Sequence, residues 1–171
     1  MIERNLEEGC GCPVKEKLRP LMKEYIATTR ALHLWFHGAH HVTRGTGFIG
    51  DHVGLYGEIY QKVQEDIDAV IEKSISILED ESIACPASIT SMAGEILSEY
   101  PSPSQHTSLA ISAHGKTLMS AYIDFLEDTH KKIKSIDAMT LGLEDLIAGT
   151  CNQYENYVYM LQQREKSDLE N

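Results

Sequence analysis

The chain has 171 residues, of which 42% are hydrophobic, and its 26 acidic against 15 basic residues give a formal net charge of -11. This balance predicts one globular domain, excludes global disorder, and disfavours a surface built to neutralise nucleic-acid phosphates. No apolar run reaches the roughly 20 residues that cross a bilayer, and residues 1–8 lack the pattern of a secretion signal, so we expect a cytoplasmic protein without a membrane segment.

The first predicted helix covers residues 13 to about 42. Its core-facing positions recur at three- and four-residue steps: Leu18, Met22, Tyr25, Thr29, Leu32 and Phe36. The glycine-containing turn at residues 44–47 ends it. We expect residues 1–12 to be a flexible tail, in which Cys10 and Cys12 are too few for a complete zinc site. The cysteine spacing does not resemble a secreted disulfide framework, which indicates a reducing compartment.

The second predicted helix runs from about residue 48 to residue 78, which is unusually long for a globular protein. It carries the same kind of apolar face, made by Leu55, Ile59, Val63, Ile67, Val70, Ile75 and Leu78. Residues 79–103 form a connection with a short helix at about 88–99, because Pro86 bounds this segment on one side and Pro101 on the other.

Two further long helices are predicted, at about 104–135 and about 140–166, and residues 167–171 form a frayed polar end. Two long helices, a long connection with a short helix, and two more long helices give an up-down-down-up arrangement with one crossover. This connectivity predicts an all-α, ferritin-like four-helix bundle over residues 13–166.

Histidines gather at the end of the first helix and just after the glycine turn: His33, His37, His40, His41 and His52. His33, His37 and either His40 or His41 fall along one side of a helix. His40 also prolongs the apolar stripe, so we expect at least one imidazole to face packed surroundings. Such a ring needs partners for both nitrogens, and a divalent metal ion is a common one.

Two carboxylates on the second helix, Asp68 and Glu72, lie one turn apart beside its apolar face. A carboxylate pair placed there is unfavourable unless it meets a cation. Histidine with carboxylate oxygen is a mixed ligand set that suits iron, manganese or zinc. The neighbouring Glu65 and Asp66 are expected on a solvent-facing side.

Residues 40–52 read HHVTRGTGFIGDH. This segment resembles the Dps-like mini-ferritins, in which a histidine, usually a tryptophan, a glycine, a phenylalanine and a second histidine follow one another with the same spacing between the histidines. That family continues with a tyrosine, an aspartate and a glutamate one turn apart, and an arginine. The corresponding residues here are Tyr60, Asp68, Glu72 and Lys73. Residues 145–147 and 155–161 resemble the family's last helix.

The resemblance implies a metal site between subunits, in which His40 and His52 of one subunit face Asp68 and Glu72 of a two-fold neighbour. It implies a homo-oligomer, typically a hollow dodecamer, with ferroxidase activity. Members of the family oxidise ferrous iron preferentially with hydrogen peroxide, store ferric mineral and thereby limit oxidative stress. These four residues are the catalytic and metal-binding residues that the resemblance assigns, with iron as the metal and zinc as an alternative.

The chain departs from the family pattern at three points. His41 replaces the tryptophan and adds a potential ligand, as His37 does one turn earlier. Tyr56 replaces a carboxylate one turn after the second histidine, a role that Asp51 or Glu58 could take. The interval from His52 to Asp68 is one residue longer, which on a regular helix separates them by roughly 160° instead of about 60°. The glycines at 54 and 57 favour absorbing this residue as a π-bulge.

Two other functions remain open from the sequence. One is a structural or assembly protein that keeps the bundle without catalysis, since the insertion and the lost carboxylate alter the iron centre. The other is a histidine-rich zinc-binding protein that uses His33, His37, His40 and His41. Neither end of the chain is a polycation, so we expect no tight DNA binding.

Overall fold

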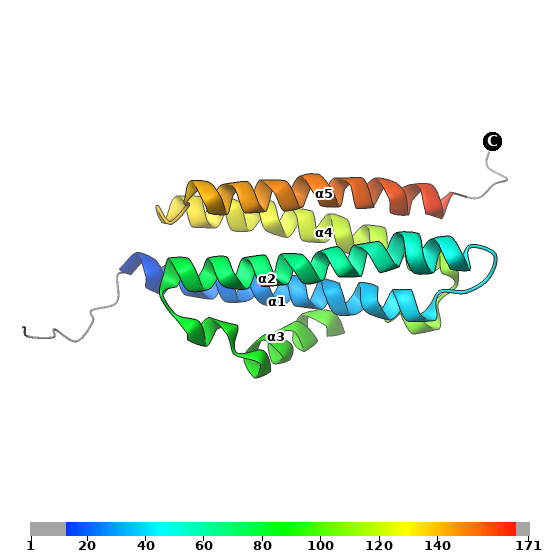
Figure 1. Ribbon diagram of the computed structural model, residues 1–171, viewed down its shortest axis with the longest axis horizontal. Helices are drawn as coiled ribbons and strands as arrows, with labels where there is room; N and C mark the ends of the chain where they lie inside the picture. Colours follow the sequence, from blue (N-terminus) through cyan, green and yellow to red (C-terminus); the bar gives the residue numbers. More distant parts are fainter. Residues whose placement is uncertain (1–12, 167–171) are drawn as a thin grey trace, which may run out of the picture.

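The structure is a computed structural model that describes residues 13–166 (Figure 1). The predicted tails at 1–12 and 167–171, and with them Cys10 and Cys12, lie outside the described residues. The long helices are α1 (Pro13–Val42), α2 (Glu58–Leu78), α4 (Ser108–Ser135) and α5 (Leu141–Glu165); the π-helix η1 (Gly50–Gly57) leads directly into α2. The connection holds the 3-10 turns η2 (Glu81–Ala84) and η3 (Pro103–Gln105) and the short helix α3 (Pro86–Ser98).

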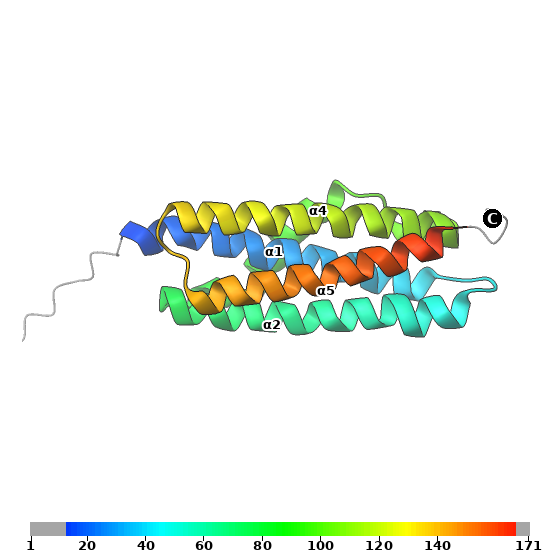
Figure 2. The ribbon, with the colours of Figure 1, turned by 90° about the horizontal axis from the view of Figure 1, so that it is seen from above.

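The four long helices form two antiparallel pairs (Figures 1 and 2). Helix α1 lies beside α2, and α4 lies beside α5. The view from above shows α4 beside α1, and α5 running obliquely across the bundle from its contact with α2. Because the crossover returns along the length of the bundle before α4 begins, α2 and α4 run in the same direction. This is the predicted ferritin-like, all-α architecture with one crossover.

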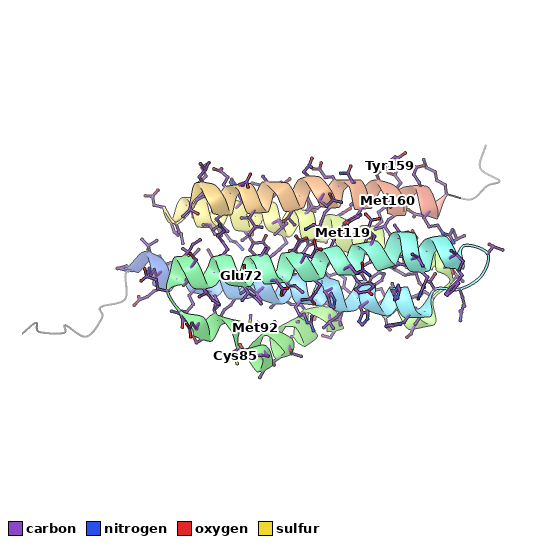
Figure 3. All side chains as sticks on the ribbon, viewed as in Figure 1. Glu72, Cys85, Met92, Met119, Tyr159 and Met160 are labelled. Atoms are coloured by element: carbon purple, nitrogen blue, oxygen red, sulfur yellow. The ribbon has the colours of Figure 1, made fainter. Side chains whose placement is uncertain are left out.

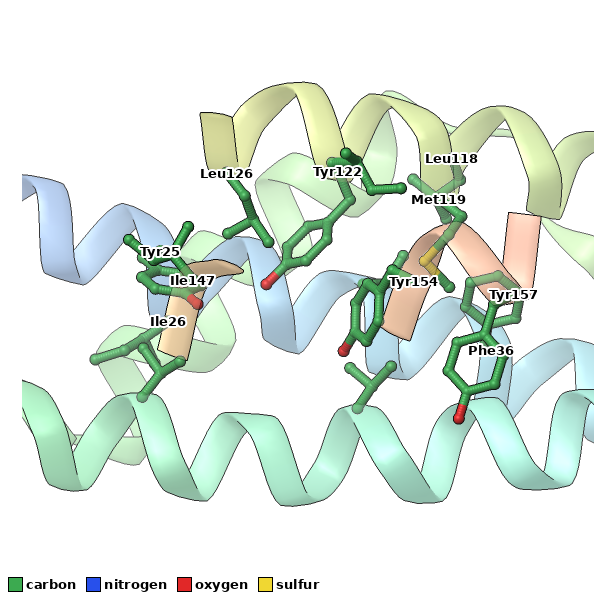
Figure 4. Packing of buried hydrophobic residues seen from close by; sticks show 14 of the residues in the cluster. Tyr25, Ile26, Phe36, Leu118, Met119, Tyr122, Leu126, Ile147, Tyr154 and Tyr157 are labelled. Carbon is green, nitrogen blue, oxygen red and sulfur yellow. The ribbon is translucent and has the colours of Figure 1, made fainter. Parts of the chain in front are cut away.

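Apolar and aromatic side chains from all four long helices fill the centre of the bundle (Figure 4). The largest fully buried side chains include Trp35, Tyr25, Tyr56, Tyr154 and Tyr157. Each helix is amphipathic, so it can bury its apolar stripe only by packing against the others. Among the described residues, no helix combines the length and apolar character needed to cross a membrane.

The crossover begins and ends at residues that suit its turns. Helix α3 begins at Pro86, two residues before the predicted start, because proline is compatible with the first helical turn. Helix α4 begins at Ser108, four residues later than predicted. Residues from Pro103 form a 3-10 turn first, and the Thr107 hydroxyl then accepts a hydrogen bond from the Ala110 amide and caps α4. Helix α3 packs against α1.

The predicted π-bulge is confirmed as the eight-residue π-helix η1. A π-helix takes up an extra residue by widening the turn, so the helical face downstream is not rotated out of register. The wide helical turns thus lie in the interval between His52 and Asp68, where the extra residue was expected, and regular α2 follows from Glu58.

Candidate metal centre

His40 and His52 meet at the end of the bundle where α1 leads through the turn into η1. Their rings stack with centroids 3.7 Å apart and planes inclined by 19°. His40 Nδ1 lies 2.7 Å from the His52 carbonyl oxygen, and His52 Nδ1 lies 2.7 Å from the His40 carbonyl oxygen. The two residues thus hold each other through a reciprocal pair of hydrogen bonds.

These hydrogen bonds determine which ring nitrogens are available. A carbonyl oxygen only accepts, so Nδ1 of both rings must carry the proton and donate it. In a neutral imidazole the other nitrogen, Nε2, then keeps its lone pair. Burial is the main cause that lowers the pKa of His40, which favours the neutral ring. This is how second-shell groups prepare histidines for metal binding: they fix tautomer and orientation before the ion arrives.

Gly57, the last residue of η1, makes this arrangement possible. A Cβ at position 57 would lie 2.6 Å from the His52 carbonyl oxygen and 3.5 Å from His40 Nδ1. The first distance is far inside van der Waals contact with a backbone atom, so a larger residue would displace the carbonyl that orients His40. A Cβ at Gly54, in the same π-helix, would meet nothing within 4 Å. Position 57 therefore requires glycine and position 54 does not.

Asp68 and Glu72 lie on α2, away from the two histidines of the same chain. Both are exposed, and Asp68 accepts a hydrogen bond of 3.4 Å from Gln64. Asp68 follows the first residue of α2 by ten positions, or roughly 15 Å along the helix axis. Figure 3 shows Glu72 in the C-terminal half of α2, far from the end that bears η1. Only a second subunit could bring carboxylates at these positions to His40 and His52.

Within the described residues of one chain, no group of three or more histidine, cysteine, aspartate or glutamate side chains is arranged to hold a metal ion. Inside the chain, the structure thus brings together two of the four predicted ligands. The other two remain accessible on the surface of α2.

Of the predicted accessory ligands, Asp51 and Glu58 contact side chains of α5, and Tyr56 is buried in the bundle. The buried Asp51 carboxylate accepts hydrogen bonds from Arg164 Nε at 2.7 Å and Nη2 at 3.0 Å. Tyr56 is buried within the bundle, and this burial raises the pKa of its hydroxyl to about 12. Glu58 is exposed and lies 3.5 Å from the Tyr157 hydroxyl of α5. None of the three joins His40 and His52 in a metal-binding group within the described residues.

The remaining predicted accessory residues, His37 and His41, do lie beside the centre. Their Nε2 atoms are 3.1 Å apart. The His41 ring is centred 5.1 Å from that of His40, and the His37 ring is centred 4.9 Å from that of Tyr60. His33, one turn before His37, is instead buried, with Nδ1 3.4 Å from Arg30 Nη1. Burial, followed by Arg30 and His37, lowers the pKa of His33 to about 4.

The prediction that Asp66 faces solvent is wrong. Its carboxylate is buried and accepts hydrogen bonds from the Tyr154 hydroxyl at 2.6 Å and from Lys62 Nζ at 2.7 Å. The sequence contained a signal for this position, because Asp66 follows Val63 by three residues and precedes Val70 by four. It therefore lies on the apolar stripe of α2. Glu65 is exposed, as predicted.

Polar side chains continue through the centre of the bundle beyond Asp66. The rings of Tyr122 and Tyr154 are centred 5.5 Å apart, and the Tyr122 hydroxyl lies 2.6 Å from Thr29 Oγ1. Thr29 in turn donates to the Tyr25 carbonyl oxygen at 2.7 Å. Figure 4 shows the tyrosines Tyr25, Tyr122 and Tyr154 along the interior of the bundle. This network is formed entirely by groups of the chain itself.

Comparison with solved structures shows which fold this is. No family model and no curated protein matches the sequence. The structure is similar to Dps from Thermosynechococcus elongatus, with 21% identity over 95% of this chain and 100% of that chain and a TM-score of 0.77. It is also similar to an archaeal Dps homologue from Halobacterium salinarum, with 12% identity, coverage of 99% and 96%, and a TM-score of 0.75.

A third similar structure is the Dps protein from Vibrio cholerae O1, with 17% identity, coverage of 90% and 91%, and a TM-score of 0.73. That protein is described as a member of a broad superfamily of ferritin-like diiron-carboxylate proteins. Together these likenesses show that the chain has the ferritin-like fold of Dps proteins. At such low identity they establish the fold and leave the chemistry to be argued from the residues.

Proposed function

We propose that this chain is a subunit of a hollow homo-oligomer, a mini-ferritin of the reducing cytoplasm that binds ferrous iron, oxidises it and stores it as ferric mineral. The observation that carries the proposal is the state of His40 and His52, whose Nδ1 atoms are both taken up by carbonyl oxygens. Their Nε2 atoms are thereby left as metal ligands. The Dps-like fold, the diiron-carboxylate description of the Vibrio cholerae protein and the net charge of -11 support it.

In the proposed site, His40 and His52 of one subunit face Asp68 and Glu72 of a two-fold-related subunit. Imidazole and carboxylate together suit iron, and the charge of the carboxylates favours the ferric ion over the ferrous ion. A two-fold interface pairs the same two surfaces twice, so each dimer would hold two such sites. The expected particle is a dodecamer of six such dimers.

The proposed reaction removes one electron from each ferrous ion. Hydrogen peroxide accepts two electrons and, with two protons, leaves as two water molecules, so a pair of ferrous ions consumes one peroxide without releasing a hydroxyl radical. Ferric ions then hydrolyse and are stored as mineral inside the particle. Zinc would occupy the same ligands but, because it does not change oxidation state, would block this reaction.

The test uses two variants, His52→Ala and Asp68→Ala, each assembled alone and then assembled as a mixture. Ferrous iron and peroxide are added without oxygen, and the absorbance of ferric species is followed. Each variant alone should lose the fast rise, because every site lacks a ligand. In a random mixture, about a quarter of the sites combine intact histidines with intact carboxylates and should recover the rise.

The matched controls are Glu65→Ala, at an exposed carboxylate of the same helix, and His114→Ala, at a histidine on α4; both should oxidise iron like the unaltered protein. A mixture that recovers nothing would contradict a site shared between subunits. If the unaltered protein forms intact particles that oxidise iron no faster than buffer, the chain is a non-catalytic assembly protein and the proposal fails.

A further inference from the structure

His37 and His41 stand one helical turn apart on the part of α1 that faces away from the bundle core. His37 is half-buried and His41 is exposed, whereas Trp35, Phe36 and Ala39 between and beside them are buried. The buried residues anchor this turn of helix, so the positions of the two imidazoles are set by a rigid element. Packing of the His37 ring against Tyr60, with centroids 4.9 Å apart, restrains it further.

The separation of the two Nε2 atoms, 3.1 Å, matches the bite of a single metal ion. Two nitrogen ligands at about 2.0–2.1 Å from a metal lie about 2.9 Å apart at a right angle and about 3.4 Å apart at the tetrahedral angle. The observed distance falls between these limits. We propose that His37 and His41 form a two-histidine chelate for a borderline divalent cation of the kind that prefers imidazole, such as Zn²⁺, Co²⁺, Ni²⁺ or Fe²⁺.

Without a cation, the same 3.1 Å contact is an imidazole-imidazole hydrogen bond, in which one Nε2–H donates to the other Nε2. Cation binding requires both Nε2 lone pairs. The donor ring supplies its lone pair by moving its proton to Nδ1, a tautomer change that leaves the ring neutral. Water molecules complete the coordination, since two protein ligands leave positions open.

This chelate differs from the proposed iron centre in one decisive respect: it is complete within a single subunit. It therefore does not rest on the proposed function and does not need Asp68 or Glu72. Its distance from that centre is short, as the rings of His40 and His41 are centred 5.1 Å apart. A cation held by His37 and His41 would sit beside the paired histidines as a second, independent metal position at this end of the bundle.

The test removes the proposed iron centre first. Untagged protein with His52→Ala and Asp68→Ala is titrated with Zn²⁺ in a calorimeter, after its helical content and particle mass have been matched to the unaltered protein. One equivalent of Zn²⁺ per chain should still bind. Adding His37→Ala or His41→Ala should weaken that binding by at least about tenfold. Adding His114→Ala, which removes a histidine from α4, should leave it unchanged.

Two results would overturn the chelate: no Zn²⁺ binding in the background variant, or binding that His37→Ala and His41→Ala leave intact. If the background variant does not assemble, the same comparison is made in the otherwise unaltered chain, where His37→Ala should lower the number of bound Zn²⁺ ions by one per chain. Failure of the iron centre would not affect either titration, so the two proposals are tested separately.

Discussion

The middle and the end of this bundle use polar side chains in opposite ways. In the middle, Asp66 accepts from Tyr154 and Lys62, and Tyr122 pairs with Thr29, so these groups find their partners within the chain. At the end, His40 and His52 satisfy one nitrogen each and keep the other open. Buried polar groups that pair with one another stabilise the fold, whereas a ring nitrogen without a partner in the chain can bind something from outside.

The difference between the paired polar groups in the middle and the available ring nitrogens at the end bears on where the proposed iron could bind. Ferritin-like diiron proteins can hold their metals in the bundle core, with glutamates and Glu-x-x-His motifs that project inward from the four helices. The buried carboxylates in the described part of this chain are Asp51 and Asp66, and each is paired with a cation of the chain, Arg164 or Lys62. A neutralised, fully hydrogen-bonded carboxylate is a poor iron ligand. Asp51 and Asp66 are therefore poor candidates for the iron that we propose, and the proposed centre stays at the end of the bundle that bears His40 and His52.

The largest expected effect is a loss of stability when a hydrogen-bonded side chain in the middle of the bundle is removed. Asp66→Ala removes the acceptor of the buried Tyr154 hydroxyl and should lower the free energy of unfolding by about 2–4 kcal/mol. Urea unfolding would measure this loss. Glu65→Ala, at the exposed neighbouring position, should change stability by less than about 0.5 kcal/mol. Equal losses for the two variants would show that the interior network contributes little.

A smaller effect, on metal binding, is expected at the open end from Gly57→Ala. The added Cβ would displace the His52 carbonyl that fixes His40, and loss of such an orienting partner typically weakens metal binding by about 10–100-fold. Gly54→Ala is the matched control in the same π-helix, and its Cβ meets no neighbour. Alanine is the better helix former at both positions, by about 1 kcal/mol, so propensity alone would favour both changes. Metal affinity that is equal in the two variants would contradict the role given to Gly57.

The smallest expected effect is a dependence of stability on pH. It comes from His33, a buried histidine that lies between the middle of the bundle and the histidines at its end. Its pKa is about 4 in the folded chain against 6.5 as the ordinary value, so on acidification the unfolded chain takes up the proton first. Stability is therefore full above pH 6.5 and declines as the pH falls toward 4. Between about pH 7 and about pH 5, protonation of His33 in the unfolded chain should lower the free energy of unfolding by roughly 1–2 kcal/mol.

His33→Gln should make the fall of unfolding free energy with acid shallower by that amount, measured by urea unfolding at both pH values. His114→Gln serves as the control that removes a histidine elsewhere. If both variants keep the slope of the unaltered protein, His33 does not titrate as its burial indicates.

The sequence by itself determined the helices, the crossover and the π-helix. Apolar residues at three- and four-residue steps specify which face of each helix is buried, because a helix repeats every 3.6 residues. The π-helix η1 was predicted from the resemblance to Dps-like proteins, because the interval from His52 to Asp68 is one residue longer than in that pattern and a single extra residue must be absorbed locally. The carboxylates of the proposed centre, Asp68 and Glu72, stay predictions, because their partners would come from another subunit.

Only the tertiary structure decided which polar side chains pair with other groups of the same chain. Asp51 meets Arg164 across 113 positions, and Asp66 meets Tyr154 across 88. Periodicity along one helix shows which face a residue occupies, but it carries no information about which side chain arrives opposite from a distant helix. For the same reason the sequence does not show that Nε2 of His40 and His52 is available, because this follows from the two carbonyl oxygens that accept from the Nδ1 atoms in the folded chain.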